Sequence, residues 1–137
     1  MRHSSTAKAT FYLTLGEWFP DDCSRVLGLT PTRIRRAGEP VREGLPPSLV
    51  NEWALDSGWV ETDRVDTVLA AFLERLSSKV REIRAFCDAH GAHCGVVVCV
   101  RVYDEPPVLD AGRDAIRHLA TLGAEFSLDI SDKRLDS

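Results

Sequence analysis

Apolar and polar residues alternate along several short stretches of the chain, and this two-residue period is typical of half-buried β-strands. In the first stretch, Phe11 and Leu13 would share one side with their apolar neighbours, while Tyr12 and Thr14 would share the other. A further short edge strand is expected within residues 32–37, because the prolines and glycines of residues 30–48 exclude longer regular structure. The alternating stretches are residues 9–15, 49–56, 93–103 and 126–130.

A different period, of three to four residues, predicts helices between these strands. The longest covers residues 62–90, and Ser77 and Ser78 are expected to bend or divide it. Shorter helices are predicted over residues 21–27 and 110–122, the latter with Ile116, Leu119 and Ala120 buried. The apolar stripe of the long helix is Val65, Val68, Leu69, Phe72, Leu76, Val80, Ile83 and Cys87.

The order of these elements predicts an α+β fold. We expect a two-layer sandwich, in which a mainly antiparallel sheet of four to five strands carries helices on one face. Its first six elements would form a ferredoxin-like unit, extended by the last helix and the last strand. One domain should span residues 9–131, with frayed ends at residues 1–8 and 132–137.

The composition and charge of the chain argue against some classes of partner for such a domain. The 137 residues suffice for one stable core, and the net charge of −4 argues against nucleic acid or an anionic membrane as the partner. The aliphatic run at residues 96–100 is too short to span a bilayer, and the N-terminus lacks the apolar segment of a signal peptide. We therefore expect a soluble cytoplasmic protein with four free cysteines.

The motif Leu27-Gly28-Leu29-Thr30-Pro31-Thr32 precedes Gly38-Glu39 and Trp53, and residues 119–130 close the pattern. With the opening strand at residues 11–15, this combination resembles the bacterial family called domain of unknown function 4279. The resemblance covers nearly the whole chain and implies a fold, but it carries no active site or cofactor. By analogy with small bacterial immunity proteins, we keep a toxin-blocking role in view.

Four arginines make residues 30–48, here called the arm, locally basic. Guanidinium groups suit phosphate or carboxylate recognition, and no aromatic residue interleaves them as single-stranded nucleic acid usually requires. The alternative is a set of solvated arginines paired with Glu39 and Glu43, which would have no binding role. The four are Arg33, Arg35, Arg36 and Arg42.

A second candidate surface is the face of the sheet turned away from the helices. A ligand site, a dimer contact and a solvated surface would all show such a mixture of residues, and a buried homodimer contact explains it most economically. The side chains expected there are Tyr12, Thr14, Glu52, Asp56, Arg101, Tyr103 and Asp129.

A weak metal candidate is formed by Cys87, His90, His93 and Cys94, which are residue types that bind zinc. Neighbouring residues of a strand point to opposite faces, so His93 and Cys94 should diverge, and we expect no metal or other cofactor. The sequence also lacks the glycine-rich loops and the nucleophile elbow of common enzyme classes. The leading hypothesis is a noncatalytic domain that binds a protein or a small acidic ligand, and the alternative is a small enzyme with a pocket between the arm and the sheet.

Overall fold

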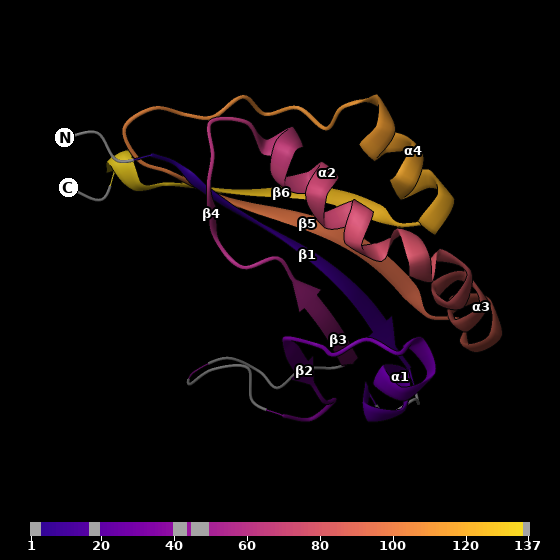
Figure 1. The fold of residues 1–137 in the computed structure, drawn as a ribbon. Coiled ribbons are helices and arrows are strands. Elements are labelled where there is room, and N and C mark those ends of the chain that lie inside the picture. Colours follow the sequence, from indigo (N-terminus) through magenta and orange to yellow (C-terminus); the bar gives the residue numbers. More distant parts are fainter. Residues whose placement is uncertain (1–3, 17–19, 40–43, 45–49, 136–137) are drawn as a thin grey trace.

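The computed structural model describes residues 4–16, 20–39, 44 and 50–135, and the chain folds as an α+β domain (Figure 1). Six strands form one open, mixed sheet in the order β2-β3-β1-β5-β6, and β4 pairs with β1 outside this path. The strands are β1 (Thr6–Leu15), β2 (Arg33–Arg35), β3 (Asn51–Asp56), β4 (Val60–Glu61), β5 (His93–Val102) and β6 (Glu125–Asp132).

Helices α2, α3 and α4 lie on one face of this sheet, and α1 lies near the end of β3 (Figure 1). A 3-10 turn, η1 (Ser77–Lys79), separates α2 from α3, so the predicted long helix is divided at the serine pair. Ser77 Oγ donates a 2.6 Å hydrogen bond to the carbonyl of Glu74, as serines do where they interrupt a helical ladder. The helices are α1 (Pro20–Leu27), α2 (Val65–Leu76), α3 (Val80–His90), α4 (Arg113–Leu122) and the short η2 (Lys133–Leu135).

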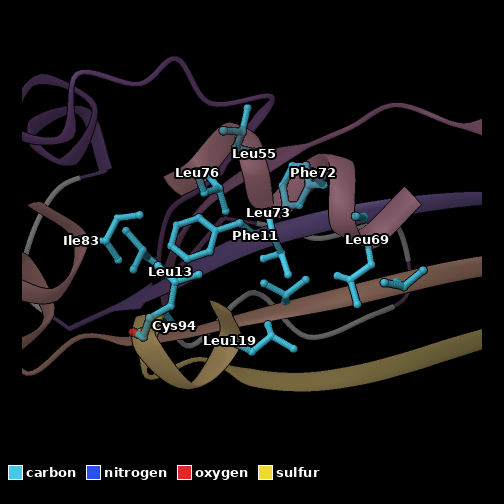
Figure 2. Close-up of a cluster of buried hydrophobic side chains, with 14 of the residues drawn as sticks. Phe11, Leu13, Leu55, Leu69, Phe72, Leu73, Leu76, Ile83, Cys94 and Leu119 are labelled. Carbon is cyan, nitrogen blue, oxygen red and sulfur yellow. Dashed lines mark hydrogen bonds between the residues drawn. The ribbon is translucent and has the colours of Figure 1, made fainter. Parts of the chain in front are cut away.

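Strand β1 lies in the middle of the sheet and supplies the centre of the core. Phe11 is opposite Leu55 of β3 on one side and Val96 of β5 on the other. These rows face α2, whose Leu69 and Phe72 are almost fully buried (Figure 2). Because the strands and α2 both contribute to this contact, apolar residues recur every two positions in the strands and every three or four positions in the helix.

Trp53 of β3 extends this core toward α1. Its ring meets the ring of Phe11 edge-on, with centroids 6.2 Å apart, and its Nε1 donates a 2.8 Å hydrogen bond to Ser24 Oγ. The buried indole therefore has a partner for its polar atom, and the bond holds α1 against the sheet.

The sheet differs from the expected one in strand direction and strand number. Strand β6 runs parallel to β5, so the sheet is mixed, although the other four described strand pairings are antiparallel. The reason is the intervening α4, which returns the chain to the end of the sheet where β5 began. A sixth strand arises because β1 starts at Thr6, where its first two residues pair with β4.

The buried side of α4 also differs from the expected one. Ile116 is 59% exposed and Ala120 is exposed, whereas Ala115, Leu119 and Leu122 face the core. Both sets have helical spacing, and the choice depends on the position of α4 beside α2 and α3. Within the described part of the chain, no helix is long and apolar enough to cross a membrane.

Leu69→Ala should lower the free energy of unfolding by about 2–5 kcal/mol, because it leaves a cavity between α2 and the sheet. Chemical denaturation followed by circular dichroism measures this change. Val26→Ala, at a side chain that is 49% exposed, is the matched control and should cost less than about 1 kcal/mol. Equal losses for the two variants would contradict the assigned core.

Candidate functional site

The strand registers define which side chains share the face turned away from the helices. Tyr12 is opposite Gly95, Lys8 is opposite Cys99, and Cys99 is opposite Asp129, so one polar row crosses three strands. We call this surface the open face. Its members include Lys8, Thr10, Tyr12, Thr14, Glu52, Asp56, Val97, Cys99, Arg101, Ser127 and Asp129.

Six of the side chains expected on this surface therefore lie on one face, and Tyr103 follows directly after β5. The Tyr103 backbone N–H donates a 3.4 Å hydrogen bond to Ser5 Oγ. Arg33 and Arg35 belong to β2 at the edge of the same sheet, and Arg36 follows that strand. Arg42 lies outside the described residues.

Tyr12 lies flat against the neighbouring strand. Its phenol ring occupies the space that a Cβ atom on Gly95 would need, so the glycine makes room for the tyrosine. Burial raises the pKa of the phenol, and the nearby carboxylates of Glu125 and Glu52 raise it further. The hydroxyl thus stays protonated and can donate a hydrogen bond at the surface.

One end of the open face carries a cluster of cations around Trp59, which is 39% exposed. The Arg101 guanidinium carbon lies 3.8 Å from the centre of the indole ring, and Lys8 Nζ lies 5.0 Å from it. Stacking of this kind orients a guanidinium while leaving its N–H donors available. Lys8 was placed in a frayed terminus by the sequence analysis, although the alternation of β1 could have been extended back to it.

Charges of both signs also converge near the centre of the face. Burial raises the pKa of Cys99, and the Asp129 carboxylate adds to this rise. Lys8, Arg33 and Arg101 act in the opposite direction on the same thiol. Long charged side chains from three strands therefore surround a half-buried centre, and this arrangement suits a partner that carries both charge signs.

The described arginines of the arm are partly paired. Arg33 Nη2 lies 2.7 Å from Glu52 Oε1, and Arg36 Nε lies 3.7 Å from Glu39 Oε1. Both arginines are exposed, while Glu52 is only 20% exposed, and an ion pair with an exposed partner contributes about 1 kcal/mol at most to stability. Arg36 thus pairs with Glu39, as in the solvated alternative, whereas Arg33 pairs with Glu52 of the open face.

A hollow of about 1090 Å³ lies elsewhere, in a groove between α2, α3 and α4. It was not anticipated from the sequence, because it depends on how far α4 stands from the other two helices. No described arm residue lines this groove or the smaller hollow at the end of β5. Its lining includes the charged residues Glu74, Arg81, Glu82, Asp114 and Arg117 together with His118.

The smaller hollow, of about 220 Å³, brings together Cys87, His93 and Cys94 beside Arg84. A hydrogen bond between the two thiols lowers the pKa of Cys87 and raises that of Cys94. His90 instead packs on Phe86, with ring centroids 4.8 Å apart. In the described part of the chain, no group of three or more potential ligands is arranged to hold a metal ion.

A comparison with protein families shows to which family the chain is related. The sequence model of the family described as Domain of unknown function (DUF4279) matches residues 5–133. The chain belongs to this family. A search of curated proteins found no match, and a search of solved structures found none either.

The residues that suggested this family serve the fold. Gly28 follows α1 with a φ of 67°, and Gly123 ends α4 with a φ of 69°, values that favour glycine. Trp53 is fully buried. The motifs shared with the family therefore correspond to turns and core residues. They say nothing about the role of the open face, which is argued below from the geometry of that face.

Gly95→Ala should displace the Tyr12 ring and lower the free energy of unfolding by about 1–3 kcal/mol. The paired variant Gly95→Ala with Tyr12→Ala should lose less than the sum of the single changes, because the clash is gone. Denaturation of all four proteins measures the coupling, which is expected to be about 0.5–3 kcal/mol. Additive losses would mean that the ring does not occupy this space.

Cys87 should react with iodoacetamide at lower pH than an ordinary thiol, whose pKa is about 8.5, because its thiolate is stabilised. Peptide mass spectrometry across a pH series gives the midpoint for each cysteine. Cys99 is also half-buried but has a raised pKa, so it is the internal control. Cys94→Ala should move the Cys87 midpoint upward, and an unchanged midpoint would rule out the thiol hydrogen bond.

Proposed function

We propose that this chain is a noncatalytic binding domain that recognises a protein partner through its open face. The observation that carries the proposal is the cluster of Trp59, Arg101 and Lys8 at one end of the open face, which also presents the half-buried Tyr12 and the carboxylate of Asp129. Tyrosine, tryptophan and arginine are enriched where protein interfaces are strongest. Rigid β-strands hold most of these side chains, which limits the entropy lost on binding.

A second form of this proposal is that the open face binds a small acidic ligand. Lys8 and Arg101 would supply its cationic contacts, and Trp59 would supply a flat apolar surface. A protein partner is favoured because the face spreads over several strands, whereas the two hollows described above lie outside the centre of the face.

We further infer a ferredoxin-like two-layer core and a bacterial, cytoplasmic setting. The order β2-β3-β1-β5, antiparallel at each pairing, supports the first inference, with α4 and β6 as the extension. In such a setting, neutralisation of a toxin is one specific form of partner binding. It would require a partner whose charges complement the mixed signs of the open face.

A photocrosslinking amino acid placed at Lys8 should capture the partner in cells, because this side chain lies on the open face. The same photocrosslinking amino acid at Ala85, which is exposed on α3 on the helix side, is the matched control. It should capture none of the proteins that position 8 captures. Gel shifts and mass spectrometry identify the captured protein. Identical products from both positions would contradict recognition by the open face.

Two further variants compare the Trp59 end of the open face with the arm, whose Arg33 and Arg35 share this face by register. Arg101→Ala should reduce capture from position 8 by about 10-fold or more, as expected for an interface residue worth at least about 1.4 kcal/mol. Combined Arg33→Ala, Arg35→Ala and Arg36→Ala should reduce it only if the arm also contacts the partner. Capture of a second copy of this chain would instead favour a homodimer through the open face.

A further inference from the structure

The two edges of the sheet differ in length and chemistry. Strand β2 exposes only three residues, Arg33–Arg35, and two of them are arginines. Proteins commonly protect a sheet edge by such shortness and charge. The opposite edge, β6, is eight residues long, and its segment 125–131 contains no lysine, arginine or proline. Its charged residues are the acidic Glu125, Asp129 and Asp132, so β6 is the longer and less protected edge, and it can accept another strand wherever these carboxylates do not meet like charges.

The apolar side chains of β6 are also incompletely covered. Phe126, Leu128 and Ile130 are 37%, 41% and 47% exposed. Their partners across the β5–β6 ladder, Val96, Val98 and Val100, share the same face and are at most 1% exposed. The difference arises because, among the described residues, β6 has a neighbouring strand on one side only. A strand added beyond β6 would cover these three side chains.

The sequence of β6 is complementary to itself in one antiparallel register. With Leu128 opposite Leu128 of a second copy, Phe126 meets Ile130 and Ser127 meets Asp129 of that copy. Glu125 then meets Ser131, so apolar residues pair with apolar residues and no two carboxylates are directly opposite. This register gives every facing position an acceptable partner.

The neighbouring symmetric registers do not share this property. In an antiparallel pair, the numbers of any two facing residues add up to the same sum. Facing residues must point to the same face of the sheet, so a change of register changes this sum in steps of two. A shift one way brings Glu125 opposite Asp129, and a shift the other way brings Asp129 opposite its own copy. Like charges directly opposite destabilise a strand pair, so the charges of β6 select the register centred on Leu128.

We propose that two copies of this chain form a symmetric dimer by antiparallel pairing of their β6 strands, with Leu128 on the twofold axis. The two sheets then become one continuous sheet, and the two open faces lie side by side on the same surface. The proposal does not depend on the open face binding a partner.

Sedimentation and light scattering on the full chain test the dimer. The wild type should associate with rising concentration, and Leu128→Asp should be a monomer because it places two like charges on the axis. Val108→Asp is the matched control, at a side chain that is 48% exposed away from β6, and it should associate like the wild type. A wild type that stays monomeric at about 100 µM, where micromolar complexes are mostly associated, would overturn the proposal.

Single cysteines along β6 test the register, in a background where the half-buried Cys87 and Cys99 are changed to alanine. Residues opposite each other in an antiparallel pair have Cα atoms about 4.5–5.5 Å apart, which suits a disulfide. Leu128→Cys should therefore crosslink efficiently on mild oxidation, while Ser127→Cys and Asp129→Cys should not. Preferential crosslinking of either of the last two, or of none of the three, would reject the register. The three β6 variants alter exposed side chains, so circular dichroism should show the same fold as that of the Cys87→Ala, Cys99→Ala background.

Discussion

The packing of α2 onto the central strand β1 is the contact on which the rest of the molecule depends. Each fully buried leucine or phenylalanine in this layer contributes about 1.5–3 kcal/mol relative to an exposed one. The same contact fixes which side of every strand faces water, because a slip of one residue would exchange the two faces. The identity of the open face is thus a consequence of the core: Tyr12 is outside because Phe11 is inside.

Local periodicity was sufficient to predict most of the elements and the shared face of Tyr12, Arg101 and Asp129. It was insufficient wherever the outcome depends on distant parts of the chain. The parallel direction of β6 follows from the path of α4 over the sheet, and the wrong assignment of Ile116 to the core follows from the rotation of that helix. The DUF4279 relationship was recognised from turn and core motifs and is confirmed by the match over residues 5–133.

The parts of the candidate site that sequence reasoning missed all join elements far apart in the chain. Trp59, in the loop after β3, meets Arg101 near the end of β5, and no local pattern relates the two. Arg84 similarly connects α3 with the turn after α4, because its guanidinium fills the space beside Gly123, and it also acts on the pKa values of Cys87 and Cys94. Such contacts depend on how whole helices and strands are placed relative to one another, and a local residue pattern does not specify this placement.

The stacking of Arg101 on Trp59 also gives this domain an intrinsic optical reporter. Of the two tryptophans in the described residues, Trp53 is fully buried and Trp59 is 39% exposed, so in a Trp18→Phe variant the two remaining indoles emit in different environments. An iodide quencher would be drawn to Trp59 by the adjacent Lys8 and Arg101 and would not reach Trp53. Any molecule that settles on this end of the sheet would shield Trp59 from iodide, so its fluorescence reports occupancy without an added label.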